Sequence, residues 1–235
     1  MKKIVVLTGA GVSAESGIKT FRDANGLWEE HNIMEVASPQ GWQKNKELVL
    51  DFYNKRRSQL KEVQPNPAHF ALKKLEERYE VQIITQNIDD LHERAGSRNV
   101  IHLHGELKKA RSTFDETLIL DWEDDLCIGD FCGNNSQLRP HVVWFGEPVP
   151  LMEKAMEITS GADILIVIGT SLQVYPAAAL MDFVQPGTKI YFIDPAPSIL
   201  KSENLEIIAE KASIGVPRLA EKLLRASPAP PKEGC

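Results

Sequence analysis

Short apolar runs alternate with longer helical patterns along most of this chain, and this alternation constrains the fold more than any other feature. The runs expected to be strands cover residues 4–7, 81–85, 100–103, 164–168 and 189–193. Helical patterns cover residues 47–61, 67–77, 151–160, 176–183 and 216–224. Several strand runs are apolar throughout, as parallel strands covered on both faces must be. The sequence therefore predicts an α/β fold with a parallel sheet.

Two segments interrupt this alternation and predict a second, smaller lobe. Residues 25–79 are helical and polar without a strand, and residues 107–143 are irregular and rich in Asp, Ser, Asn and Gly. We expect a single domain over residues 1–228, with a large lobe from about 1–24, 80–106 and 144–228 and a small lobe from about 25–79 and 107–143. The Pro-rich residues 229–235 are expected to form a flexible tail.

Composition excludes several classes of protein. Apolar residues make up 43% of the 235 residues, and no apolar stretch approaches the ~20 residues of a membrane span. The net charge of −6 argues against general affinity for nucleic acid or an anionic membrane. The apolar run after Lys3 is too short for a signal peptide, and three cysteines cannot form a disulfide framework. We therefore expect a cytoplasmic protein.

A glycine-bearing turn follows the first expected strand and should open a helix. It runs from Gly9 to Gly17, and such a turn can hold a pyrophosphate on free N–H groups. A dehydrogenase would place a second strand ending in Asp or Glu about 20 residues later. This sequence shows no such strand at that spacing. Phe21 and Arg22 beside the turn instead offer an aromatic face and a guanidinium. A tight turn without a ligand is the alternative.

Polar side chains follow the next expected strand. Gln86, Asn87 and Asp89 lie where α/β folds place their ligands, and Asn87 and Asp89 can hold an amide-bearing ring such as nicotinamide. The alternative role is to cap the helix that begins near Asp90. Both roles can coexist.

The remaining strands also end in polar groups. His104 precedes a glycine and suits a general base that takes a proton from a hydroxyl. Thr170 and Ser171 can bind a phosphate or a ribose, and Asp194 can accept from ribose hydroxyls. Each signal is weak alone, but their shared position at successive strand ends predicts one site.

The combined motifs resemble the sirtuins in order and spacing over most of the chain. They are Gly-Ala-Gly-Val-Ser from Gly9, Thr-Phe-Arg from Thr20, Gln-Asn-Ile-Asp from Gln86, His104-Gly105, Arg-Pro-His-Val-Val-Trp-Phe-Gly-Glu from Arg139, and Gly-Thr-Ser from Gly169. The resemblance implies a Rossmann-like large lobe and a small lobe formed from two insertions. It also implies NAD in the cleft between them and acyl-lysine protein substrates that enter from the other side.

The resemblance assigns roles to individual residues. His104 becomes the catalytic base. The residues expected to bind NAD are Gly9, Ala10, Gly11, Ser13, Glu15, Phe21, Arg22, Gln86, Asn87, Asp89, Gly169, Thr170, Ser171, Asp194 and Ala212. Those expected to bind substrate are Ala37, Tyr53, Arg56, Val143, Phe145, Gly146, Glu147, Leu172 and Val174. The implied reaction releases nicotinamide and gives free lysine and O-acyl-ADP-ribose.

One helical segment indicates which acyl group is removed. Tyr53 and Arg56 are three residues apart and share a helix face, where a phenol and a guanidinium can bind a carboxylate. This pattern resembles the sirtuins that remove succinyl and malonyl groups, and Ala37 matches the small residue that leaves room for the longer chain. The alternative is an amphipathic helix with ordinary solvated charges.

The chain departs from the family at the metal site. Most sirtuins bind a structural zinc with two Cys-x-x-Cys pairs, but here the first pair is missing and Cys127 and Cys132 are separated by four residues. We therefore expect no bound metal, with the lobe held by Phe114, Leu118, Leu120, Trp122 and Phe131. A second departure is Asp194, where the family usually has Asn.

Three other functions remain open at this point. A mono-ADP-ribosyltransferase would use NAD without an acyl pocket, and a silent NAD-sensing module would need no base at His104. A metal hydrolase would use His102, His104, Asp89 and Asp90, although their spacing matches no metal motif. The sequence gives no indication of the oligomeric state.

Overall fold

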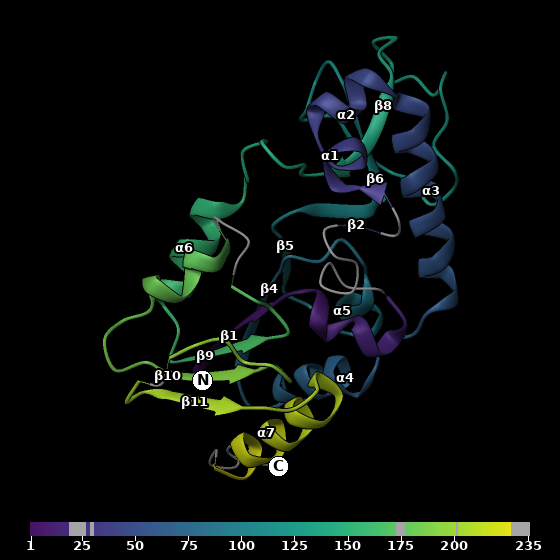
Figure 1. Ribbon diagram of the computed structural model, residues 1–235. Helices are drawn as coiled ribbons and strands as arrows, with labels where there is room; N and C mark the ends of the chain where they lie inside the picture. Colours follow the sequence, from purple (N-terminus) through teal and green to yellow (C-terminus); the bar gives the residue numbers. More distant parts are fainter. Residues whose placement is uncertain (19–26, 29–30, 173–176, 201, 227–235) are drawn as a thin grey trace, which may run out of the picture.

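The computed structural model describes residues 1–18, 27–28, 31–172, 177–200 and 202–226. A parallel sheet and the helices on its two faces form one lobe, and a smaller group of helices and strands lies above it in Figure 1. The predicted α/β fold with a second lobe is confirmed. Among the described residues, no helix is long and apolar enough to cross a bilayer.

The large lobe is built on a six-stranded parallel sheet in the order β11-β10-β9-β1-β4-β5. The strands are β1 Lys3–Thr8, β4 Glu80–Thr85, β5 Val100–His102, β9 Ile164–Ile168, β10 Lys189–Ile193 and β11 Leu205–Ile208. The chain builds outwards from β1 to one edge and then from β9 to the other, as in dinucleotide-binding folds. The order therefore reverses between β1 and β9, where such sheets open a crevice at their carboxyl ends.

Alternate residues of the strands face two separate cores. Ile4 and Val6 of β1 pack against α4 (Pro67–Leu75) and α7 (Ala212–Ala226), whereas Val5 and Leu7 pack towards α6 (Met152–Ser160) and the 3-10 helix η3 (Ala177–Phe183). This alternation follows from the two-residue period of a strand. Because both faces are covered, the strands can be apolar throughout, as the sequence predicts.

The small lobe combines short helices, one long helix and an antiparallel sheet. Its elements are β2 Leu27–Trp28, β3 His31–Asn32, α1 Ile33–Val36, α2 Pro39–Lys44, α3 Lys46–Glu62, β6 Gly105–Ser112, β7 Ile119–Asp121 and β8 Leu138–Val142. α3 begins where the Asn45 side chain accepts from the N–H of Leu48. Its buried face, including Phe52 and Tyr53, packs in one cluster with Trp144.

Several sequence expectations for the lobes are corrected. Residues 107–143 are not irregular, because they contribute most of the three-stranded sheet β7-β6-β8. Residues 25–79 contain β2 and β3, and their last helix, α4, packs on the large-lobe sheet with α7. Phe114 and Phe131 do not hold the small lobe, since 76% and 55% of their surfaces are exposed. Leu107, Leu126 and Trp144 fill that core instead.

The glycine turn after β1 also differs from expectation. It forms two short 3-10 helices, η1 Ala10–Val12 and η2 Ala14–Ser16, and Gly17 then takes a left-handed conformation. Residues 177–183 likewise form the 3-10 helix η3 rather than an α-helix.

Candidate active site

A cavity of about 690 Å³ lies at the carboxyl ends of the sheet strands. It is lined by the turn after β1, the loops after β4, β5 and β9, and residues of α3 and of the segment after β8. It therefore occupies the crevice that the reversal of strand order creates, and it continues into the small lobe.

The turn after β1 packs directly against the turn after β9. Gly11 donates its N–H to the carbonyl of Gly169, and a Cβ at Gly11 would lie 2.6 Å from the Gly169 Cα. Asn66, the N-cap of α4, donates from its side chain to the carbonyl of Val12 and to the Ser16 hydroxyl. Glycine is thus required at Gly11 for the two turns to pack backbone against backbone. The N-cap of α4 also fixes the turn after β1 through its hydrogen bonds.

Glu15 and Ala212 line one end of the cavity. The Glu15 carboxylate accepts from the Ser213 N–H at 2.9 Å and from the Ser213 hydroxyl at 2.7 Å. Ser213 lies in the first turn of α7, where a carboxylate is favoured by unpaired N–H groups and by the helix dipole. Glu15 therefore ties the turn after β1 to the start of α7.

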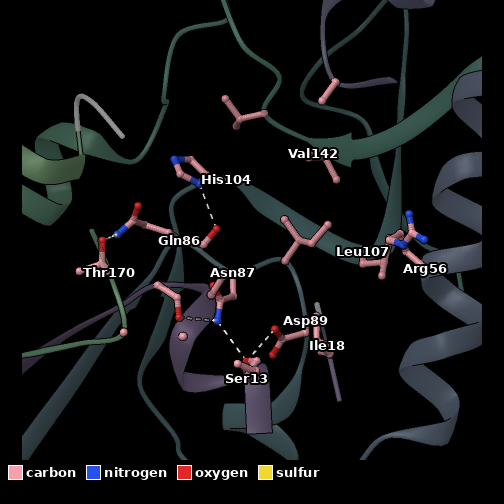
Figure 2. A pocket seen from close by; sticks show the side chains of 18 of the residues that line it. Ser13, Ile18, Arg56, Gln86, Asn87, Asp89, His104, Leu107, Val142 and Thr170 are labelled. Carbon is pink, nitrogen blue, oxygen red and sulfur yellow. Dashed lines mark hydrogen bonds between the residues drawn. The ribbon is translucent and has the colours of Figure 1, made fainter. Parts of the chain in front are cut away.

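Asn87, Ser13 and Asp89 form a buried hydrogen-bond network on the cavity floor (Figure 2). The Ser13 hydroxyl donates to Asp89 Oδ2 at 3.0 Å, while the Asn87 amide donates to Ser13 Oγ and to the Gly9 carbonyl. Asp89 Oδ1 also accepts from the N–H of Leu91, so the capping role and the cavity position coexist. Burial raises the pKa of Asp89 to about 6 despite these hydrogen bonds.

His104 has a defined tautomer. Its Nδ1 lies 3.0 Å from the Gln86 carbonyl oxygen, which can only accept, so Nδ1 carries the proton. The neutral ring therefore keeps Nε2 as an acceptor. Burial lowers the pKa of His104 below its ordinary value, against the opposing effect of the Gln86 carbonyl. A neutral imidazole on the cavity wall is the form that a general base requires.

His102 has a different role from its neighbour. Its Nδ1 lies 2.9 Å from the Asn87 carbonyl and its Nε2 lies 2.9 Å from Glu93 Oε1. Burial alone would lower the pKa of His102, but the hydrogen bond and charge of Glu93 raise it. Because both ring nitrogens face acceptors, the protonated ring fits this position and holds the Asn87 backbone in place.

Tyr53 and Arg56 line the cavity at its α3 side. In Figure 2, Arg56 and His104 come from opposite sides of the cavity, with Leu107 and Val142 between them. The Trp144 indole donates to the Tyr53 oxygen at 3.0 Å, and the Arg56 guanidinium lies 4.4 Å from the Phe52 ring centroid. Burial raises the pKa of Tyr53, so the phenol stays protonated.

Glu147 organises the segment after β8. It accepts from Arg139 at 2.6 and 3.0 Å, from Arg111 at 3.1 Å and from the N–H of Trp144 at 2.8 Å. Burial would raise the pKa of Glu147, but the hydrogen bonds from Arg139 and Trp144 hold it below its ordinary value. The Val143 N–H donates to the His104 carbonyl, so this segment is also attached to the catalytic candidate.

Most of the residues predicted from sequence meet in this cavity. Those that line it are Gly9, Ala10, Gly11, Ser13, Glu15, Ala37, Tyr53, Arg56, Gln86, Asn87, Asp89, His104, Val143, Phe145, Gly146, Glu147, Gly169, Thr170, Ser171, Asp194 and Ala212. Leu172 is described but packs against the core with η3 instead. Phe21, Arg22 and Val174 lie outside the described residues.

Other lining residues were not predicted. Ile18, Leu60, Leu107 and Val142 supply apolar wall between the two ends of the cavity. Isolated apolar residues in a helix or strand carry no signal that separates a cavity wall from ordinary core. The supporting side chain of Asn66 could have been found, since Asn-Pro predicts a helix start, but its contact with the turn after β1 could not.

The two cysteines of the small lobe have different environments. Cys127 is exposed, whereas Cys132 is buried and its thiol donates to the Ser112 hydroxyl at 3.3 Å. Within the described ranges, no group of three or more His, Cys, Asp or Glu side chains could hold a metal. The absence of zinc stays a prediction.

The donor set of the cavity fits a dinucleotide. Close-packed glycine turns lie at the reversal of strand order, Thr170 and Ser171 contribute hydroxyls, and Asp194 follows β10. These groups match pyrophosphate and ribose, and the Asn87 amide with Asp89 suits a carboxamide ring.

Fold and cavity together define a dinucleotide-binding α/β protein with a candidate general base. Comparison with known proteins is more specific. Residues 9–176 match the SIR2 (Sir2 family) domain. The chain is 57% identical over 225 residues to the NAD-dependent protein deacylase of Helicobacter pylori, covering 95% of this chain and 98% of that protein. It is 48% identical over 233 residues to the NAD-dependent protein deacylase of Bacteroides thetaiotaomicron, covering 96% and 100%.

Solved structures also match this chain to the Sir2 family. A Sir2 homolog–NAD complex is 42% identical, with a TM-score of 0.86 over 96% of this chain and 90% of that chain. The chain belongs to the Sir2 family, which confirms the resemblance found in its sequence.

Proposed function

We propose that this chain is an NAD-dependent protein deacylase that removes acidic acyl groups, succinyl and malonyl, and also acetyl, from lysine side chains. Relatives covering almost the whole chain are named NAD-dependent protein deacylases, and a related structure is a complex with NAD. Acyl-lysine segments of proteins are the proposed substrates.

The proposed NAD site uses the sheet end of the cavity. The turns around Gly11 and Gly169 would receive the pyrophosphate, Ser171 and Asp194 the adenosine side, and Asn87 with Asp89 the nicotinamide carboxamide. When bound, NAD supplies an ADP-ribosyl group that accepts the acyl group, with nicotinamide as leaving group. The buried floor beneath Asn87 excludes water from this end.

His104 is the proposed general base. Its Nδ1 proton is held by the Gln86 carbonyl, so Nε2 is the nitrogen that can accept a proton from a ribose hydroxyl. The lowered pKa of His104 keeps the ring neutral near pH 7. The network of Glu147 with Arg139 fixes the segment after β8, beside which the substrate backbone would bind as an added strand.

The observation that carries the acyl preference is that Tyr53, Arg56 and Ala37 line the same cavity as His104. A protonated phenol and a guanidinium can both donate to a carboxylate, and the small Ala37 leaves space. The apolar wall of Leu107 and Val142 lies between Arg56 and His104, where it would contact the methylenes of the acyl chain (Figure 2).

The test compares succinyl-, malonyl- and acetyl-lysine forms of one peptide in wild type and Arg56→Met. We expect Arg56→Met to lower kcat/KM for the acidic acyl groups by about 10–150-fold, which corresponds to one lost charge-assisted hydrogen bond, and to change acetyl turnover by less than about threefold. Tyr53→Phe should act in the same direction with a smaller effect.

Lys55→Met is the matched control, because Lys55 lies on the exposed side of α3 and pairs with Asp51 at 2.8 Å. It should leave all three rates unchanged. Equal losses for acidic and acetyl groups in Arg56→Met would reject the acidic preference and leave the deacylase proposal standing.

A further inference from the structure

A second, smaller cavity of about 140 Å³ lies where α3, α5 (Leu91–Arg94) and β6 meet. Its walls are Arg57, Leu60, Lys61, Asp90, Arg94, Lys108 and Glu123. Leu60 also lines the large cavity, so the two spaces lie on either side of this residue. None of the steps proposed above uses the small cavity.

Arg57 is the unusual residue of this cavity. Only 2% of its surface is exposed, and its guanidinium is fixed by Nε donating to the Leu107 carbonyl at 3.0 Å and Nη1 donating to Asn54 Oδ1 at 2.6 Å. The third nitrogen, Nη2, is buried and has no hydrogen-bond partner within the described part of the chain. Burial lowers the pKa of Arg57 to about 10, although Asp125 opposes this effect. A buried cationic donor without an acceptor is costly.

The acidic residues of the walls are already engaged. Lys108 Nζ lies 2.6 Å from Glu123 and 3.4 Å from Asp90, and Arg94 lies 3.7 Å from Asp90. Arg94 also donates to the carbonyls of Leu60 and Val63. Over the ranges that the structure describes, Arg57 makes no ion pair.

The net charge of the cavity walls is positive. Four cationic side chains, Arg57, Lys61, Arg94 and Lys108, face two carboxylates, which leaves a net charge of +2. Among the residues that the structure describes, the one ion pair of Lys61 is an exposed pair with Asp124 at 3.8 Å. A water occupies about 30 Å³ of liquid, so the cavity has room for a small oxyanion.

We propose that this cavity binds a small oxyanion of the inorganic phosphate type. Arg57 Nη2 would donate to one oxygen, and the Lys61 ammonium at the exposed side would complete the binding. A guanidinium fixed at Nε and Nη1, whose buried Nη2 still lacks an acceptor, is preorganised for such a ligand. Since α3 and α5 would both face the ion, its binding should also raise thermal stability.

The experiment titrates inorganic phosphate into the protein by calorimetry at constant ionic strength, with chloride as the balancing anion. Saturating ADP-ribose and an Arg56→Met background keep phosphate away from the large cavity. We expect one phosphate per chain and a higher Tm in phosphate than in chloride. No phosphate binding beyond that of chloride would overturn the proposal.

Two variants locate the site. Arg57→Met should weaken phosphate binding by at least about tenfold. Lys61→Gln should weaken it by about threefold and, being exposed, should leave the fold intact even if Arg57→Met does not fold. Lys55→Gln, which removes the same charge from the same helix outside the cavity, should have no effect. Phosphate binding that is unchanged in Lys61→Gln, or equally weakened in Lys55→Gln, would contradict the assignment.

Discussion

Asp89 is a carboxyl group that the fold keeps buried in spite of its charge. Burial raises its pKa from 3.8 to about 6, so the unfolded chain loses this proton first as the pH rises. The folded state therefore loses stability between about pH 4 and pH 6 and does not regain it above. At pH 8 the raised pKa of Asp89 lowers the free energy of unfolding by about 3 kcal/mol. A cost of this kind is typical of a residue kept for function.

Asp89→Asn should therefore stabilise the protein, by roughly 2–3 kcal/mol at pH 8 and by much less near pH 4. The amide oxygen can still accept from the Leu91 N–H, and the new NH2 group can donate to the Ser13 hydroxyl oxygen. Urea unfolding at several pH values measures the difference, with Asp51→Asn on the exposed side of α3 as the control. A stability difference that does not change with pH would contradict the assignment. The same variant should turn over acyl peptide more slowly.

His104→Ala should lower kcat by about 10²–10⁴-fold while leaving affinity for ADP-ribose within about threefold, since the proposed role is proton transfer. Turnover and calorimetric titration test the two parts separately. A parallel loss of ADP-ribose affinity would show that His104 binds rather than acts as a base.

At the residue scale, the sequence predicted the cavity well because strand ends of a parallel sheet converge. The positions of Asn87, His104 and Thr170 in the cavity could be predicted once the strands that precede them were recognised. The partners of these residues were not predictable. Glu15 meets Ser213 from a distant part of the chain, and Glu93 of α5 meets His102 of β5 only because of how these two elements pack.

At the element scale, apolar runs predicted most strands of the parallel sheet correctly. Polar composition was a poorer guide, because residues 107–143 were expected to be irregular and contain strands. β9 and β10 begin and end at the predicted residues, because their runs are apolar and bounded by turns. β11 was missed, since Leu205–Ile208 is short and contains a charged residue. The antiparallel sheet was missed because its strands lie among Asp, Ser and Asn, and their pairing is set by distant segments.

The segment after β8 depends on the ion cluster around Glu147. The side chains of Glu147, Arg111 and Arg139 are only 15%, 6% and 9% exposed. Glu147→Gln would leave two buried guanidiniums without a counter-charge and should lower the free energy of unfolding by about 3 kcal/mol. It should also raise KM for the peptide more than it lowers kcat. Glu153→Gln, on the exposed face of α6, should change neither quantity. Wild-type stability in Glu147→Gln would show that the cluster is not structural.

At the scale of the whole molecule, the small lobe is predicted to fold without zinc. Its core of Leu107, Leu126, Leu138 and Trp144 is apolar, and Cys132 contacts Ser112. Purified protein should contain well under one zinc per chain, and a chelator should change neither Tm nor turnover. One zinc per chain whose removal lowers Tm would reject this prediction.

We propose that the two lobes together couple NAD consumption to removal of an acyl group. The most direct measurement is mass spectrometry of the products of a succinyl-lysine peptide, with and without NAD, alongside nicotinamide release. We expect equal amounts of nicotinamide, free lysine peptide and O-succinyl-ADP-ribose, formed only when NAD and acyl peptide are both present. Nicotinamide released without the acyl peptide, with ADP-ribose attached to protein, would contradict it.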